Sequence, residues 1–205
     1  MQRISIEKLR VRSNSEYWVG CNCGLAKEYK IHKIHVHPNF NFESDLKGDF
    51  DLALIATKGN WKGKYDKTSE KYLHFYKSSL TGTLTVLGWG VSKLHDTSPT
   101  DLRRNENLMI LPSNFCQQHF PFEFSNQSFC VSDKNFRRES PCFLNHGGPL
   151  LISDVSSNQT TLIGIAAYTP PVCDESLEPA LIVNVSLHAD FINSSFWLFD
   201  NVTYT

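Results

Sequence analysis

The sequence lacks several features that would assign it to a broad class of protein. No apolar run approaches the ~18 residues that span a bilayer, and residues 1–8 lack the apolar stretch of a signal peptide. No internal repeat or low-complexity linker is present. The net charge is −1, so the composition shows neither the excess of positive charge typical of nucleic-acid binding nor a polybasic patch for a membrane surface. We therefore expect neither a nucleic-acid partner nor insertion into a membrane.

The bulk composition is that of an ordinary globular protein. The chain has 205 residues, of which 40% are hydrophobic and 20% are charged. A chain of this length can bury a substantial core as one large domain or two small ones.

Cysteines and glycosylation sequons favour an extracellular protein over a cytosolic one. Six cysteines are present, and two pairs have spacings that suit disulfides within loops, Cys116 with Cys130 and Cys142 with Cys173. Five Asn-x-Ser/Thr sequons lie in the C-terminal part, at Asn126, Asn158, Asn184, Asn193 and Asn201. The alternative is that these sequons arose by chance on a cytosolic chain. We expect a secreted protein whose leader is absent from this chain.

Short β-rich runs separated by turn signals recur along the chain and predict an all-β barrel or sandwich. These runs are Leu9–Arg12, Tyr29–His37, Asp51–Thr57, Thr83–Val91, Leu108–Leu111, Pro149–Ser153, Thr160–Tyr168 and Ala180–Ser186. Two helices are also predicted, one capped by Ser113 and one at the C-terminal end capped by Ser186. The polar, Lys-rich stretch Lys58–Ser79 is interpreted as a surface connection between two halves.

Five motifs in a fixed order give the sequence its specificity. They are His37-Pro38-Asn39-Phe40 with Asp51-Leu52-Ala53-Leu54, then Gly88-Trp89-Gly90, then Cys142 to Leu150, then Gly164 to Tyr168 with Cys173, and finally Pro179 to Ser186. Their order and residues resemble the motifs of the trypsin/chymotrypsin family of serine proteases. The resemblance runs from about Leu9 to the C-terminal helix. An unrelated β protein with chance matches is the alternative reading.

The resemblance implies an all-β, trypsin-like double β-barrel with a C-terminal α-helix. Residues 1–80 would be the remnant of the first barrel and residues 81–205 the second barrel with its helix. The segment that carries the family's histidine base has no counterpart here, so we expect an N-terminally truncated chain with an incomplete first barrel. Such a barrel would expose unpaired sheet edges.

The same resemblance places degenerate residues at the catalytic positions. Asp51 would be the aspartate that orients the base, and we expect it to hydrogen-bond neighbouring backbone as a relic. His146 stands at the position of the nucleophilic serine, where it offers no hydroxyl for acyl transfer. Leu144 replaces an oxyanion-hole glycine, whose backbone conformation is costly for other residues. Asn145 replaces an aspartate that would pair with the new α-ammonium after zymogen cleavage, and an amide needs no such partner.

The specificity pocket implied by the resemblance is narrowed. Its base would be Ser140, which offers no charge for a basic side chain. Its walls would be Thr169 and Ala180, with Ala167 and Tyr168 beside them. Side chains on both walls should hinder a large substrate residue.

Three other clusters admit more than one interpretation. His32, His35 and His37 lie near Cys21 and Cys23 and could form a metal site, but surface histidines are the preferred reading, so we expect no metal and no cofactor. The two cysteines could bond to each other, stay free, or have lost their partners. The aromatic residues Phe191, Phe196, Trp197 and Phe199 are expected to dock the terminal helix on the second barrel.

These observations predict a secreted serine protease homologue without catalytic activity. It would act by binding an unidentified protein partner, such as a protease, an inhibitor or another component of a proteolytic cascade, as a cofactor or decoy. The alternatives are a divergent but active trypsin-like endopeptidase and a truncated product without a stable fold.

Overall fold

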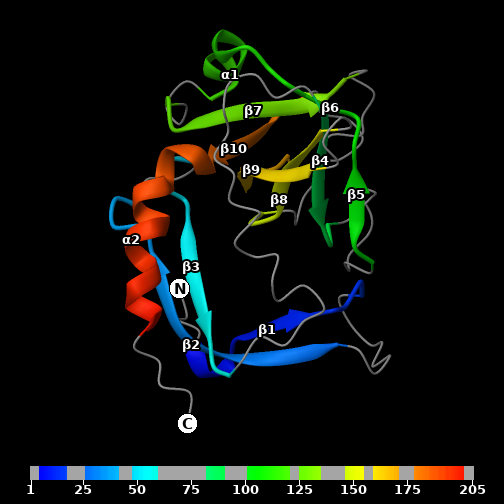
Figure 1. Cartoon of the computed structure of the whole chain (residues 1–205). Coiled ribbons are helices and arrows are strands. Elements are labelled where there is room, and N and C mark those ends of the chain that lie inside the picture. The colour runs from blue at the N-terminus through cyan, green and yellow to red at the C-terminus, as the bar shows by residue number, and fades with distance from the viewer. Residues whose placement is uncertain are drawn as a thin grey trace.

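A computed structural model gives the structure of the protein. It describes residues 5–17, 26–41, 48–59, 82–90, 101–120, 125–134, 146–154, 159–170 and 178–200, and in two of these ranges the side chains of residues 159 and 196–200 are not described. Two antiparallel sheets and a C-terminal helix make up this part of the chain (Figure 1).

The first sheet has three strands in the order β1-β2-β3. They are β1 (Arg10–Ser13), β2 (Lys27–Val36) and β3 (Ala53–Thr57), and the short 3-10 helix η1 (Ile6–Lys8) precedes β1. The pairing of β2 with β3 is irregular between Ile31 and Lys33. Such a bulge bends the strand, and β2 does curve from beside the C-terminal helix to the level of β1 in Figure 1.

The register of the three strands separates their side chains onto two faces, because residues opposite one another project to the same side. We call the first the apolar face after most of its side chains, and its members are Val11, Ser13, Lys27, Tyr29, Ile31, Ile34, Val36, Ala53, Ile55 and Thr57. We call the second the α2 face, and its members are Arg10, Arg12, Glu28, Lys30, Lys33, His35, Leu54, Ala56 and Lys58.

The second sheet has seven strands in the order β5-β4-β8-β9-β10-β7-β6. Their bounds are β4 (Thr83–Gly88), β5 (Arg103–Asn105), β6 (Leu108–Ile110), β7 (Ser128–Asp133), β8 (Pro149–Asp154), β9 (Gln159–Tyr168) and β10 (Ala180–Asn184). The two edge strands, β5 and β6, are separated in the chain by Glu106 and Asn107 alone. Since the edges of the sheet must meet at this corner, the sheet curls into a nearly closed barrel.

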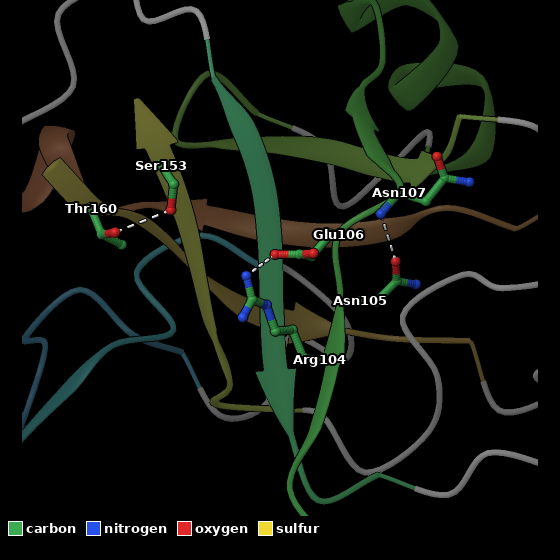
Figure 2. A network of polar contacts seen from close by, with 6 residues as sticks. All are labelled: Arg104, Asn105, Glu106, Asn107, Ser153 and Thr160. Atoms are coloured by element: carbon green, nitrogen blue, oxygen red, sulfur yellow. Dashed lines mark hydrogen bonds and ion pairs between the residues drawn. The ribbon is translucent and has the colours of Figure 1, made fainter. Parts of the chain in front are cut away.

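Polar contacts hold the corner between the two edge strands. Asn105 Oδ1 accepts a hydrogen bond from the Asn107 backbone N–H at 3.0 Å, and Arg104 pairs with Glu106 (Figure 2). The Asn107 side chain donates to the buried carboxylate of Asp133 on β7 at 2.7 Å. This corner therefore connects both edge strands to the interior strand β7.

The barrel interior is filled by apolar side chains from its successive strands. Ten buried residues form one cluster, namely Leu84, Val86, Leu108, Val131, Leu150, Ile152, Ile163, Ala166, Ala180 and Ile182. They come from β4, β6, β7, β8, β9 and β10, so the cluster spans the barrel rather than one face of it.

A helix and a disulfide close one side of the barrel. The helix α1 (Ser113–His119) follows β6, and its buried Cys116 bonds Cys130 of β7, with the two Cα atoms 5.7 Å apart. Leu111, Phe120 and Leu181 complete this cluster. The prediction that Ser113 caps the helix is wrong: it is the first helical residue, and Pro112 occupies the cap without a side-chain bond.

The C-terminal end of the described chain is helical, as predicted, but begins differently. The 3-10 helix η3 (Val185–His188) leads into α2 (Ala189–Asp200). Ser186 is not the cap, because the Asn184 side chain accepts the Ser186 backbone N–H and hydroxyl at 3.2 Å and 2.7 Å. A side-chain acceptor two residues before the donor is the usual form of such a cap.

The terminal helix contacts the barrel, as expected, and it also contacts the first sheet, which was not expected. Its buried residues Phe191 and Ile192 form a cluster with Val185, and partly buried neighbours come from both sheets: Leu52, Leu54, Leu162 and Ile165. Figure 1 shows α2 alongside β2 and β3. The helix therefore joins the two sheets.

The all-β prediction is confirmed, and each predicted strand overlaps an observed one. Two strands, β5 and β7, were not predicted. β5 has the sequence Arg-Arg-Asn, and half of β7 consists of buried polar residues, so neither carries the apolar alternation by which strands are recognised.

Candidate functional site

Asp51 is presented by a tight turn just before β3. Phe50 has a φ of 59°, and its carbonyl accepts the Leu52 backbone N–H at 2.7 Å. A positive φ on an aromatic residue is strained, and the ring of Phe50 is held by contacts with His37 and His188. The turn therefore fixes the direction in which the Asp51 carboxylate leaves the sheet.

His146 is presented by a second turn, just before β8 of the barrel. Gly147 has a φ of 77°, which favours glycine, and its N–H donates to the Ala166 carbonyl at 2.8 Å. Ala166 in turn donates to Gly148 at 2.9 Å. These two bonds hold the turn against the end of β9.

The imidazole of His146 adds a hydrogen bond just beyond the end of β9. Its Nε2 accepts the Thr169 backbone N–H at 3.2 Å, so the proton of a neutral ring lies on Nδ1. The ring centroid lies 6.4 Å from that of Tyr168. His146 therefore uses its Nε2 lone pair within the chain itself.

The two turns bring Asp51 and His146 within electrostatic range of one another, from two different sheets. Although Asp51 remains exposed, the protein around its carboxylate removes enough water to raise its pKa, and the Coulombic interaction with His146 opposes this rise. We expected the carboxylate to bond neighbouring backbone, but among the described residues no donor does so. The residue that acts electrostatically on this carboxylate is His146, at the nucleophile position.

The predicted pocket walls lie at the ends of β9 and β10. Thr169 and Ala180 are buried, and Ala167 and Tyr168 are half-buried. The Tyr168 hydroxyl donates to Glu178 at 3.0 Å; burial, the hydrogen bond and the carboxylate charge together raise the Tyr168 pKa to about 12. This side chain is therefore a neutral donor held in place, not a proton-transfer group at ordinary pH.

A close approach between the halves of the chain occurs at the same pocket. A Cβ on Gly48 would lie 2.7 Å from the Leu181 Cδ2 atom and 3.4 Å from the Ala167 Cβ atom. The loop before Asp51 can thus contact the strand ends of the barrel because residue 48 has no side chain.

The structure adds an aromatic cluster that sequence reasoning missed. The ring of His37 lies 5.1 Å from that of His188, 4.7 Å from that of Phe50 and 4.5 Å from that of Phe191. His35 also stacks on Phe191, at 5.3 Å. His37 is buried, so the expectation of a surface histidine is wrong for this residue. Its neighbour in the cluster, His188, carries no local sequence signal, because only helix docking brings it there.

Burial is the largest cause of a lowered pKa in both buried histidines. Burial and the charge of His35 lower the pKa of His37. Burial and His37 lower that of His188, against an opposing effect of Asp49. The His188 Nε2 atom has no hydrogen-bond partner among the described residues. Within those residues, no group of three or more His, Cys, Asp or Glu side chains could hold a metal ion.

Several predicted site residues lie outside the described residues, and nothing further is said of their positions. They are the oxyanion, activation and pocket positions Leu144, Asn145 and Ser140, the cysteines Cys21, Cys23, Cys142 and Cys173, and the sequons at Asn158 and Asn201.

The predicted Cys116–Cys130 disulfide is confirmed. Of the described sequon residues, Asn126 and Asn193 are exposed, whereas Asn184 is half-buried with its side-chain oxygen engaged by Ser186. No helix of the described residues is long and apolar enough to cross a membrane.

Fold and site together define a class of protein. The described chain has a nearly closed barrel, a second β-sheet, a C-terminal helix and a site made by turns from both sheets. This arrangement is consistent with the two-barrel serine protease scaffold. The family model described as Trypsin matches residues 5–192. The chain therefore belongs to the trypsin family.

Curated relatives agree with this assignment. A venom serine protease of Polistes dominula is 21% identical over 183 residues, which cover 88% of this chain and 62% of that protein. Venom serine protease 34 of Apis mellifera is 25% identical over 68% of this chain and 34% of its own length. A collagenase of Hypoderma lineatum is 31% identical over 54% and 39%, respectively. The chain thus spans less than two thirds of the length of each of these relatives.

Proposed function

We propose that this chain is a secreted, non-catalytic member of the trypsin family that acts by binding another protein, as a cofactor or decoy in a proteolytic cascade. The observation that carries the proposal is the bond between His146 Nε2 and the Thr169 backbone N–H. An imidazole at the nucleophile position supplies no hydroxyl, and here its accepting nitrogen is already occupied.

The surroundings of His146 also support a loss of catalysis. Asp51 interacts electrostatically with His146, so the carboxylate acts on the residue at the nucleophile position. The Thr169 hydroxyl is buried without a described partner, which makes it unsuitable as a replacement nucleophile. An extracellular location is supported by the Cys116–Cys130 disulfide and by the relatives named as venom proteases.

A second candidate, a divergent active peptidase, draws on the same pair of residues. An imidazole facing a carboxylate is the arrangement that a general base requires. For His146 to serve as that base, it would have to release the Thr169 N–H and receive a proton from a nucleophile supplied elsewhere.

A serine-directed fluorophosphonate probe distinguishes the two candidates, because it labels only an activated nucleophile. The purified full chain should remain unlabelled under conditions that label trypsin completely. The variant His146→Ser should also remain unlabelled, since no described histidine contacts position 146 to activate a serine there. His119→Ser, at an exposed position on α1, is the matched control.

Covalent labelling of the native chain, or cleavage of a peptide library that phosphonate treatment abolishes, would overturn the non-catalytic proposal. The expected positive result is a stable, stoichiometric complex with another protein secreted from the same source. This complex should persist after phosphonate treatment.

A further inference from the structure

A row of cations crosses the α2 face of the first sheet. Arg10 on β1 lies directly opposite Lys30 on β2. The Lys58 backbone N–H donates to the Lys30 carbonyl at 2.7 Å, which continues the row past the end of β3. Lys33 projects to the same face beyond the bulge, opposite Ala56. We call these four residues, all exposed, the cation row.

Within the described residues, no carboxylate neutralises the lysines of this row. Like charges placed directly opposite one another destabilise a sheet. Glu28 is the acidic residue of the α2 face, and Arg12 lies opposite it. No ion pair joins Lys30, Lys33 or Lys58 to another described residue, whereas Arg104 on the barrel is paired with Glu106. The row is thus a concentration of positive charge that an anion would stabilise.

The helix α2 leaves this end of the face open. His35 and Leu54 of the same face pack against the helix through Phe191 and its cluster. The lysines lie further along the strands and stay exposed. The Arg10 guanidinium donates to the backbone carbonyls of Glu7 and Leu9, at 2.5 Å and 2.7 Å. Since neighbouring strands are ~4.8 Å apart, the lysine ammonium groups are borne on an open array rather than in a pocket.

We propose that the cation row binds a linear sulfated polysaccharide. A regular array of cations on an open sheet fits a polymer with repeated anionic groups, and the proposed extracellular location favours sulfate over nucleic-acid phosphate. On the described α2 face the aromatic ring is that of His35, which stacks on Phe191 and is not free for base stacking. Among the described residues of the α2 face, no exposed large apolar side chain flanks the row to insert into a membrane.

The overall net charge of −1 conceals this surface. Balanced composition argues against a strongly basic chain, but charge segregation depends on strand register. Arg10, Lys30 and Lys58 are distant in sequence and meet through pairing alone.

The test is elution from immobilised heparin in a sodium chloride gradient, with the full chain and two charge-matched variants. The first variant combines Lys30→Gln, Lys33→Gln and Lys58→Gln. The second, as control, combines Arg103→Gln, Arg104→Gln and Lys134→Gln, which are exposed on the barrel. The first should lose affinity for heparin by about tenfold or more at physiological ionic strength, and the control by less than about twofold. Unchanged thermal transitions would show that both variants are folded.

Four results would overturn the proposal. They are no retention of the native chain at physiological salt, equal losses in both variants, equal retention on unsulfated dextran, and tighter binding to a single-stranded oligonucleotide or phosphatidylserine vesicles than to heparin. Labelling by the phosphonate probe would refute the proposed function without affecting this test, because the cation row lies apart from Asp51 and His146.

Discussion

The two sheets of this protein share an antiparallel plan, but they bury their apolar residues to very different extents. In the seven-stranded sheet, Leu150 and Ile182 are fully buried, and four of the five residues of β10 are inaccessible. In the three-stranded sheet, Tyr29 and Ile31 of the apolar face are buried, but Val36 and Ile55 of the same face retain exposures of 48% and 51%. Both sheets contain strands whose apolar residues alternate. They differ because the larger sheet closes into a nearly complete barrel.

Closure of the larger sheet depends on a short connection. Because Glu106 and Asn107 join its two edge strands, side chains that point inward meet others from across the barrel. Among the described residues, the smaller sheet has β1 and β3 as separate edges, and helix α2 covers part of one face. An alternating strand therefore buries its apolar side chains only where a second layer faces them.

The largest effect that we predict would test this difference in burial directly. Leu150→Ala should lower the free energy of unfolding by about 4 kcal/mol, because it leaves a cavity in the barrel core. Ile55→Ala, the matched substitution on the apolar face, should cost less than about 1 kcal/mol. Urea denaturation of both variants measures the two values. Similar losses would mean that the apolar face is as well covered as the barrel.

The second prediction concerns the disulfide of the barrel. Replacing both Cys116 and Cys130 by Ala releases a cross-link across 14 residues, and should lower the free energy of unfolding by about 3 kcal/mol. Hydrogen exchange should accelerate in α1 and β7 while the amides of β1 and β2 keep their native rates. If β1 and β2 respond as strongly as β7, the two sheets unfold as one unit and the contrast between them is only local.

The third prediction concerns pH and the junction between the sheets. The folded-state pKa of His37 and of His188 is lowered from the ordinary value of 6.5. Below pH 6.5 the unfolded chain therefore binds protons that the folded chain does not. The stability contribution is complete above 6.5 and falls as pH decreases through the folded-state pKa values. Thermal melts from pH 8 to pH 5 should show this loss.

Two variants locate the origin of that pH dependence. His188→Phe should flatten the stability profile, because an apolar ring replaces a buried titrating one beside Phe50 and His37. His119→Phe, on the exposed surface of α1, should leave it unchanged. An unaltered slope in His188→Phe would place the proton uptake elsewhere.

The smallest predicted effect concerns the candidate site. His146→Ala should change the free energy of unfolding by less than about 0.5 kcal/mol, since the side chain is exposed. Loss of the 3.2 Å bond should nevertheless accelerate exchange of the Thr169 amide hydrogen by about fivefold. Nuclear magnetic resonance measures this rate, with His119→Ala as control. An unchanged Thr169 rate would show that the imidazole does not protect that N–H.

The sequence predicted the strands whose apolar residues alternate or run together, including β2, β8, β9 and β10, and also the Cys116–Cys130 bond. It did not predict β5, where Arg103 and Arg104 carry no apolar signal. Nor did it predict that Asn184 would cap η3, since Ser186 is an equally good capping residue when judged locally.

The candidate site was predictable only in part for a related reason. Family resemblance placed Asp51 and His146 at their positions, but not the hydrogen bond to Thr169, which depends on the turn at Gly147. His188 and the cation row depend on tertiary docking and on strand register. Neither leaves a periodic pattern in the sequence.

The contact between Phe191 and the histidines of β2 also bears on how the chain is made. During synthesis the strands of the first sheet leave the ribosome early, whereas α2, which packs on His35 and His37, follows after the whole barrel. Until then the nascent sheet has no helix to cover its Leu54 and its imidazole rings. Contacts of such long sequence separation form slowly. The strands of the first sheet therefore have the longest exposure to chaperones, even though they are translated before the barrel.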